Sequence, residues 1–524
     1  MRDKIEEMPT ITSVLGISMG DEGKGRVVHE LLDLLEKEWG KPPFGVLKVN
    51  GGANAGHTAA GLKLNFLPSG VGNSRVECLL IGSGVVADPR KFIWEAKPLE
   101  SRGITVMKRL RIDQRCQVSD LCHRLLDLAW ENYREKVLGL ENRGTTGRGI
   151  SPAYCDETSQ WQIFYQVFQE ERSVYRSMLK SRMQRAMDTI RYVCKVSESD
   201  WRGFFETLSN SEHKANQSAL DEGFFSPDEF NFMPFASAEP FSLDFELLEN
   251  TYWEAGMKLV DCIYDVRELM LTSVHKKKVV VAEFGQAYWL DKRHGFTPNV
   301  TASHTTGTEL FNSAGIPLSK ISQVGCCKAY DTKVGTHHFI TKLDQIHDPW
   351  GKKLSKLEFG TSTGRQRMVG WFDSVEKGNA LRYGGFDHLV INKLDALTAT
   401  DSSMSHLKIC TAYESPDGSF SKTVPRDEIS RKMMVPFYES FPVWTEDLQK
   451  IRSYEDFPLE AKNYLSRMIC SLIEVAYPEG FENVNLPQLL FIGVGPSPGQ
   501  VIGNLPSTLS FIDHYKSQVL SHLS

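Results

Sequence analysis

Two short glycine-rich stretches, close together near the start of the chain, most constrain its fold. The first reads Gly20-Asp21-Glu22-Gly23-Lys24-Gly25 and the second Asn50-Gly51-Gly52-Ala53-Asn54-Ala55-Gly56-His57-Thr58. Glycine lets the backbone come close to a phosphate and direct its N–H groups toward it. Asp21 and His57 add a carboxylate and an imidazole that can move protons. Together the two stretches predict a phosphate site with proton chemistry built into it.

Short apolar runs recur along the chain, and Gly or polar residues follow each of them. They cover residues 14–17, 44–49, 78–81, 279–281, 389–391 and 489–492. Fully apolar strands indicate a sheet covered on both faces, with ligand loops at the strand ends. After the first run, apolar residues at helical spacing from Val27 to Leu35 predict a helix. We therefore expect an α/β fold with a large, mostly parallel central sheet flanked by helices and a nucleotide site like that of P-loop NTPases.

The segment 157–250 has a different pattern. Apolar residues recur every three to four positions from Phe164 to Ile190, with Arg172, Arg176, Arg182 and Arg185 between them. This spacing predicts one long helix or two shorter ones. We expect a loop over 209–223 and irregular structure over 224–245. The chain then divides into an N-terminal α/β part (1–156) with the phosphate and catalytic loops, a mainly helical or irregular insertion (157–250) and an α/β part (251–524), all in one continuous globular body.

Charge and composition narrow the class of protein. The formal net charge of −6 argues against a general nucleic-acid or membrane-surface binder. No apolar run approaches transmembrane length, and the polar N-terminus has no signal-peptide core. The ten cysteines are scattered without metal-binding spacing. We therefore expect a cytoplasmic protein without a structural zinc site.

Two further runs combine hydroxyl groups with arginine. They are Gly144-Thr145-Thr146-Gly147-Arg148-Gly149-Ile150 and residues 360–367. Because arginine offers a two-pronged fork to carboxylates and phosphates, two such runs in one chain favour anion binding over solvated surface turns.

The first glycine loop is not a Walker A motif, because Gly25 and not Ser or Thr follows Lys24. Later in the chain, Asn392-Lys393-Leu394-Asp395 follows an apolar run and has the form of the guanine-reading NKxD loop of GTPases. The same four residues also suit an ordinary strand-end turn, so both interpretations stay open here.

Taken in order, these motifs resemble the adenylosuccinate synthetase family. The family's GDEGKGK loop is GDEGKGR at 20–26, and its NAGHT is intact at 54–58. The remaining matches are TTGRGISPAY at 145–154, EFGQA at 283–287, VTAS at 300–303, KAYDTKVG at 328–335, STGRQRMVGWFD at 362–373, NKLDAL at 392–397 and GVGP at 493–496. The resemblance covers nearly the whole chain except about 157–250.

The resemblance implies a GTP-dependent ligase of purine nucleotide biosynthesis. It would condense L-aspartate with the 6-oxo position of IMP through a 6-phosphoryl intermediate, giving adenylosuccinate. The implied catalytic residues are Asp21, as the base at purine N1, His57 at the transferred phosphoryl group, Lys24 and Gln286. Asp21 and the Gly56 carbonyl would hold Mg²⁺. A homodimer is also implied.

The resemblance further implies two sets of binding residues. The nucleotide set comprises Gly20, Glu22, Gly23, Gly25, Arg26, Asn54, Thr58, Thr146, Thr301, Arg367, Lys393, Asp395, Gly495 and Pro496. The aspartate set comprises Thr361, Ser362, Thr363 and Arg365.

One departure concerns the phosphate of the purine nucleotide. Shortly after its PAYEDK motif the family carries two arginines, one of which reaches across the dimer to the 5′-phosphate of IMP. Here residues 158–161 read Thr-Ser-Gln-Trp, and the nearest arginines lie between Arg172 and Arg185. Two alternatives therefore stay open: a paralogue that uses another purine nucleotide, such as GMP or dGMP, and a non-catalytic nucleotide-binding regulatory protein.

Overall fold

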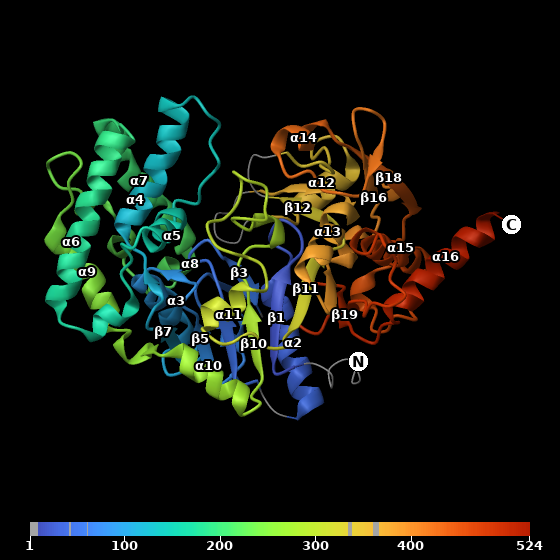
Figure 1. The fold of residues 1–524 in the computed structure, drawn as a ribbon, viewed down its shortest axis with the longest axis horizontal. Coiled ribbons are helices and arrows are strands. Elements are labelled where there is room, and N and C mark those ends of the chain that lie inside the picture. The colour runs from blue at the N-terminus through green and yellow to red at the C-terminus, as the bar shows by residue number, and fades with distance from the viewer. Residues whose placement is uncertain (1–8, 41–42, 60, 334–337, 360–365, 524) are drawn as a thin grey trace.

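The computed structural model describes residues 9–40, 43–59, 61–333, 338–359 and 366–523. A ten-stranded sheet lies at the centre of this structure (Figure 1). Its strand order is β20-β19-β15-β11-β1-β10-β2-β5-β7-β9. Neighbouring strands are parallel except β19 and β20. The predicted α/β fold with a mostly parallel central sheet is confirmed.

The strands of this sheet include all six predicted apolar runs. Their bounds are β1 Ile11–Gly16, β2 Gly45–Lys48, β5 Cys78–Ile81, β7 Leu110–Asp113, β9 Ile263–Tyr264, β10 Val280–Glu283, β11 Ser322–Lys328, β15 His388–Asn392, β19 Gln488–Gly493 and β20 Val501–Ile502. The prediction missed β7, β9, β11 and β20. In β11, Gln323 and Gly325 interrupt the apolar character of the strand.

Strands from the two ends of the chain alternate within this sheet. β10 lies between β1 and β2, so that Val280 pairs with Ile11 on one side and with Gly45 on the other. The parts 1–156 and 251–524 therefore build one sheet together. Their proposed boundaries lie inside helices, residue 156 in α5 (Ile150–Thr158) and residue 250 in α9 (Phe245–Met257), and the division stays a proposal.

Helices cover both sides of the sheet. The first, α2 (Lys24–Trp39), begins directly after the first glycine loop, as predicted. The others are α3 Pro89–Ser101, α4 Leu121–Asn132, α6 Arg172–Asp188, α7 Glu198–Ala215, α8 Gln217–Asp221, α10 Val266–His275, α11 Glu309–Ala314, α12 Pro349–Ser355, α13 Ser374–Gly384, α14 Glu428–Met433, α15 Leu459–Ala476 and α16 Thr508–Leu523. A smaller sheet of β14 (Phe372–Asp373), β16 (His406–Glu414), β17 (Phe420–Ser421) and β18 (Val435–Pro442) lies near α13 and α15.

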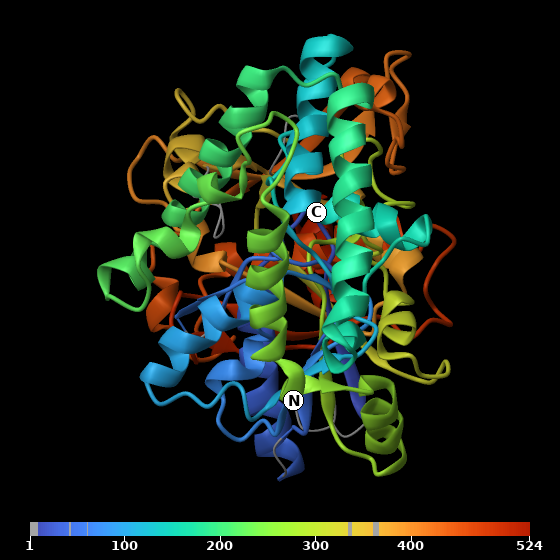
Figure 2. The same ribbon diagram turned by 90° about the vertical axis from the view of Figure 1, so that its left-hand side faces the viewer.

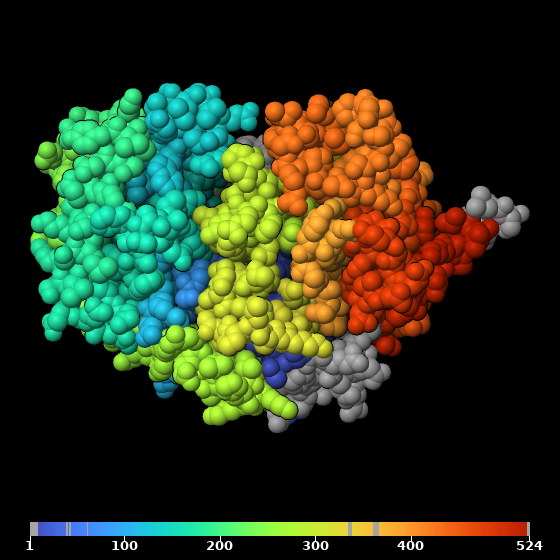
Figure 3. Space-filling view, in the orientation of Figure 1, coloured from blue at the N-terminus to red at the C-terminus, as the bar shows by residue number. Residues whose placement is uncertain are grey.

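Helices of the segment 157–250 gather beyond the β7 end of the sheet (Figure 1), and Figure 2 turns this side toward the viewer. The predicted helical run from 164 to 190 is a 3₁₀-helix, Tyr165–Gln169, followed by α6. Phe168, Tyr175 and Trp253 pack as an aromatic cluster with ring centroids 5.4–5.9 Å apart. In the space-filling view of Figure 3 this segment and the C-terminal part bulge on opposite sides of the molecule.

The expected loop over 209–223 is wrong. Residues 209–215 complete α7, and α8 follows. Ser197 caps the N-terminus of α7 by accepting a hydrogen bond from the Asp200 N–H at 3.1 Å. Trp201, Phe205, Leu208 and Glu212 are all buried and recur at helical spacing. The polar residues that suggested a loop occupy mainly the outer face of this helix. No helix within the described residues is long and apolar enough to cross a membrane.

Candidate active site

A cavity of about 420 Å³ lies beyond the carboxyl ends of three neighbouring strands, β1, β10 and β2. Each strand is followed by a loop that lines it: the first glycine loop after β1, the second after β2 and residues 284–287 after β10. Residues 143–146 and 298–301 line it as well, together with Gln366 and Arg367. Parallel neighbours end at the same edge of a sheet, which is why loops far apart in sequence meet here.

The two glycine loops are in direct contact. A side chain at Gly25 would place its Cβ 3.0 Å from the His57 ring and 2.9 Å from the Thr58 carbonyl oxygen, so only glycine fits between them. Gly23 has φ 84°, a left-handed conformation that turns the loop into α2. Gly23 and the first two residues of α2, Lys24 and Gly25, line the cavity, so the N-terminus of this helix lies at its wall. A helix N-terminus is a favourable site for an anion.

Asp21 and His57 line this same cavity. The Asp21 carboxylate oxygen Oδ2 lies 2.7 Å from Arg367 Nε and 3.3 Å from Lys328 Nζ. Burial acts to raise the pKa of Asp21, but Lys328, Arg367 and Lys393 outweigh it and lower this pKa. Asp21 is therefore ionised at neutral pH, the form that a general base requires.

His57 has two different contacts. Its Nδ1 donates to the Ala55 carbonyl oxygen at 3.0 Å, and its Nε2 lies 3.2 Å from Glu283 Oε1. Burial outweighs the Glu283 carboxylate and lowers the pKa of His57. An anion that arrives beside the ring would favour its protonation.

Glu283 belongs to the quoted EFGQA motif but was not predicted as a site residue. It ends β10, and its other oxygen, Oε2, accepts a hydrogen bond from the Ser69 N–H at 2.8 Å. Burial would raise the pKa of Glu283, yet nearby His57 and Lys48 outweigh this and lower it. The signal available in the sequence was an acidic residue directly at the end of an apolar strand.

Gln286 has an unsatisfied side chain. Both of its amide atoms are buried, and neither makes a hydrogen bond to any residue in the described part of the chain. The residue lines the cavity and has φ 56°, in the left-handed region. Buried polar atoms are rarely left unpaired, because each costs about 1–3 kcal/mol. This amide is therefore positioned to bind a polar ligand.

Eight predicted nucleotide contacts line the same cavity: Gly20, Gly23, Gly25, Asn54, Thr58, Thr146, Thr301 and Arg367. The predicted catalytic Lys24 and the predicted metal ligand Gly56 line it as well. Asn54 Nδ2 donates to Thr301 Oγ1 at 3.4 Å, which joins two walls of the cavity. Glu22 faces inward instead, where its carboxylate accepts hydrogen bonds from the Gly20 N–H and from Lys24 Nζ, both at 2.7 Å.

The remaining predicted nucleotide residues lie outside the lining of this cavity. Lys393 and Asp395 follow β15, where Lys393 Nζ contacts Glu358 at 2.6 Å and Asp395 accepts from Gln449 at 3.2 Å. Gly495 and Pro496 follow β19. Arg26 donates to the carbonyl oxygens of Gly495 and Gln500, so its guanidinium holds that loop. The predicted aspartate residues Thr361, Ser362, Thr363 and Arg365 lie outside the described residues.

Comparison with known proteins identifies the family. The family model described as adenylosuccinate synthetase matches residues 13–229 and 228–477. The chain belongs to the adenylosuccinate synthetase family. It is 33% identical over 465 residues to the adenylosuccinate synthetase of Vibrio vulnificus, which covers 87% of this chain and 92% of the relative. It is equally similar, 33% over 465 residues, to that of Kocuria rhizophila.

Solved structures give the same result. The fully ligated adenylosuccinate synthetase of Plasmodium falciparum aligns with a TM-score of 0.75 and 25% identity, over 95% of this chain and 100% of that one. The succinoaminodeoxyadenylate synthetase of cyanophage S-2L, bound to dGMP and dATP, aligns with a TM-score of 0.51 and 15% identity. The second similarity concerns the fold alone.

In this member of the adenylosuccinate synthetase family, the four arginines between residues 172 and 185 form ion pairs with carboxylates away from the cavity. Arg172 pairs with Glu249, Arg176 with Glu246, and Arg182 and Arg185 both with Asp156. None of the four lines the cavity. They tie the helical segment together and to α5.

A buried carboxylate from this segment supports the motif at 144–150. Glu212 on α7 is fully buried and contacts Lys91 of α3, Arg124 of α4 and Arg148 of the motif. The attraction of three cations outweighs burial and lowers the pKa of Glu212 well below its usual value. The helical segment therefore anchors the loop that carries Thr146.

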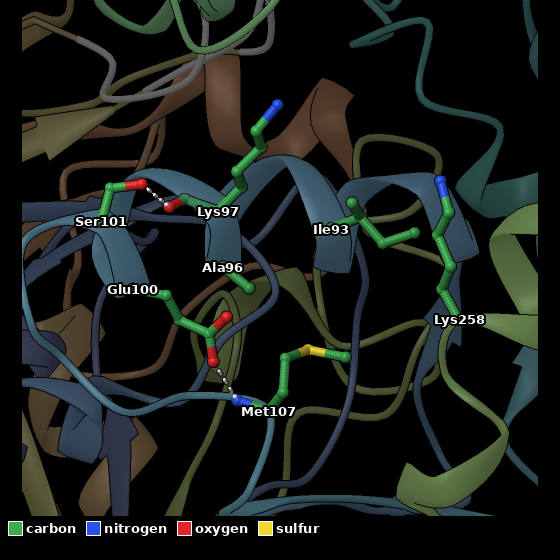
Figure 4. A pocket seen from close by; sticks show the side chains of 7 residues that line it. All are labelled: Ile93, Ala96, Lys97, Glu100, Ser101, Met107 and Lys258. Carbon is green, nitrogen blue, oxygen red and sulfur yellow. Dashed lines mark hydrogen bonds between the residues drawn. The ribbon is translucent and has the colours of Figure 1, made fainter.

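A second hollow lies on the surface between α3 and Lys258 (Figure 4). Two of its polar side chains are paired locally: Ser101 donates to the Lys97 carbonyl oxygen at 2.9 Å, and Glu100 accepts from the Met107 N–H at 2.9 Å. It contains no arrangement of groups suited to catalysis.

Proposed function

We propose that this protein joins L-aspartate to IMP at the expense of GTP and forms adenylosuccinate. The observation that carries the proposal is the convergence of an ionised Asp21, the His57 imidazole and the unsatisfied Gln286 amide on one cavity. Membership of the adenylosuccinate synthetase family supports the same reaction.

In the first step, Asp21 takes the proton from N1 of the purine, which turns the 6-oxygen into a nucleophile. That oxygen attacks the γ-phosphorus of GTP, GDP leaves, and a 6-phosphoryl nucleotide forms. His57 Nε2 donates to the phosphoryl oxygens as negative charge gathers on them. Lys24 and the N–H groups at the start of α2 hold the phosphates.

In the second step, the amine of aspartate attacks C6 and inorganic phosphate leaves. The phosphoryl group is needed because an oxo oxygen is a poor leaving group and phosphate is a good one. We assign Thr361, Ser362, Thr363 and Arg365 to the aspartate carboxylates. Lys393 and Asp395 would recognise the guanine of GTP, with Gly495 and Pro496 beside it.

Magnesium fits the oxygen groups at the cavity. Lys328 and Arg367 both approach Oδ2 of Asp21, so Oδ1 and the Gly56 carbonyl oxygen are the atoms we assign to the ion. Mg²⁺ is commonly held by one or two protein oxygens together with substrate phosphates. When bound, it would neutralise phosphate charge during the transfer.

We also propose a homodimer and a cytoplasmic location. All ten cysteines lie in the described residues as free thiols.

A panel of nucleotides tests the proposal. Purified protein is incubated with GTP, Mg²⁺, L-aspartate and either IMP, GMP or dGMP, and products are separated by chromatography. We expect product from IMP. If only GMP or dGMP gives product, the substrate is that guanylate and not IMP. Nucleotide binding without any product would favour the regulatory protein.

A further inference from the structure

Among the described residues, the lysine and arginine side chains that line the cavity are Lys24, Arg143 and Arg367. Lys24 Nζ is 2.7 Å from Glu22, and Arg367 Nε is 2.7 Å from Asp21. Arg143 differs from both. Its Nε lies 3.6 Å from Glu131 Oε1, which is too far for a hydrogen bond. Its side chain is 39% exposed, so its guanidinium has room to reorient toward a ligand.

The two carboxylates near Arg143 already serve the loop that follows it. Glu131 Oε2 accepts a hydrogen bond from the Gly144 N–H at 3.0 Å, and Asp127 Oδ2 accepts from the Gly149 N–H at 3.0 Å. Burial raises the pKa of Asp127, so this carboxyl holds its negative charge less firmly than an exposed one. Both acids fix the shape of the loop and position Arg143 and Thr146 on the cavity wall.

We propose that Arg143 binds the 5′-phosphate of the purine nucleotide from within the same chain. This inference rests on the proposed function, which brings a nucleoside monophosphate into the cavity. A phosphate taken out of water needs cationic donors, and a guanidinium fork matches its oxygens. The Thr145 and Thr146 hydroxyls line the same wall.

The arginines farther along the chain are not placed to bind this phosphate. Arg172, Arg176, Arg182 and Arg185 are bound to carboxylates away from the cavity. Arg143 directly precedes the Gly144 turn and so moves with the loop that carries Thr146. The position of the phosphate is thereby linked to the loop that Glu212 anchors through Arg148.

The test compares Arg143→Ala and Arg143→Lys with the matched control Arg176→Ala, which breaks an exposed ion pair on α6. Binding of IMP and of inosine, which lacks the phosphate, is measured by calorimetry on the full chain, and KM is measured for all three substrates. Thermal melts establish that each variant folds.

We expect Arg143→Ala to weaken IMP binding about 10–100-fold, as for loss of a charged hydrogen bond, with inosine binding and the KM values of GTP and aspartate unchanged within about twofold. Arg143→Lys recovers part of the loss, because lysine keeps the charge but not the fork. Arg176→Ala behaves as wild type.

Unchanged IMP binding in folded Arg143→Ala would overturn the inference while the wild type continues to make adenylosuccinate. If the wild type turns over only a guanylate, the IMP assignment fails, and the same variants measure the role of Arg143 on that guanylate. If the wild type binds no purine monophosphate, the Arg143 assignment is overturned together with the proposed function.

Discussion

His57 Nε2 lies 3.2 Å from Glu283 Oε1, on the wall of the cavity. Glu283 ends β10, and His57 follows the glycine loop that comes after β2, the parallel neighbour of β10. The carboxyl ends of these two strands therefore bring the residues together. Glu283 is itself held by the Ser69 N–H and by the charge of buried Lys48. The imidazole thus has a fixed acidic neighbour that influences its protonation.

The first prediction concerns the pH profile of Glu283→Gln. Burial lowers the pKa of His57, Lys48 lowers it further and Glu283 raises it. Removing the carboxylate takes away the largest of the influences that raise this pKa, and the Ala55 carbonyl and Glu95 supply only smaller ones. The imidazolium therefore forms at lower pH. In the pH profile of kcat/KM for GTP, we expect the part that reports the titration of His57 to move to lower pH. Activity at pH 7 should fall by about tenfold or more, up to the 10²–10⁴-fold loss typical of a missing acid–base group.

His57→Asn serves as the reference for this experiment. In the double variant His57→Asn/Glu283→Gln, that part of the pH profile should be absent and the loss of activity should not exceed that of His57→Asn by much, because residues that act together are non-additive. An unshifted pH profile in Glu283→Gln would contradict the coupling.

The second prediction concerns Asp21→Asn. The amide keeps the shape of the side chain but cannot take a proton from purine N1. We expect kcat to fall by about 10²–10⁴-fold, the contribution of a positioned base, while GTP affinity stays within a few-fold. Steady-state kinetics and equilibrium GTP binding measure the two quantities. Full activity in this variant would exclude Asp21 as the base.

The third prediction separates binding from stability at Gln286. The described residues offer its amide no hydrogen bond, so Gln286→Leu removes none of the protein's own pairings. We expect KM for the purine nucleotide to rise by about tenfold, since a hydrogen bond is worth about 1 kcal/mol or more, with no loss of thermal stability. A large fall in melting temperature would indicate that the amide has a structural partner instead.

The fourth prediction concerns the anchor of the loop at Glu212. Glu212→Gln leaves Lys91, Arg124 and Arg148 without their shared buried counter-charge. Breaking a buried ion pair from one side costs about 3–5 kcal/mol. We expect a large fall in the free energy of unfolding and a higher KM for the purine nucleotide, both measured at 20 °C or below.

The control for Glu212 is Glu246→Gln, which removes an exposed partner of Arg176. Exposed ion pairs contribute about 0–1 kcal/mol, so this variant should melt close to wild type. Equal effects of the two substitutions would show that Glu212 is not an anchor.

Sequence patterns were sufficient where one local cause decides the structure. Apolar runs followed by Gly or polar residues predicted the strands β1, β2, β5, β10, β15 and β19. They failed where tertiary burial decides: residues 209–215 are polar on average, yet Glu212 and Ser209 are buried and the segment is helical. Glu283 was overlooked because its importance comes from its contact with His57, which the fold brings to it from a distant part of the sequence.

The amino-acid sequence by itself determined the α/β class, the order of the loops and the family, because backbone freedom at glycine and the period of apolar residues act over a few positions. Only the tertiary structure decided which charges meet. Arg26 turns to the loop after β19, Asp21 takes Arg367 and Lys328, and Arg143 stays available at the cavity. Strand order decides which charged groups come near one another. Burial makes an unpaired charge costly enough in free energy that each group is held by a particular partner.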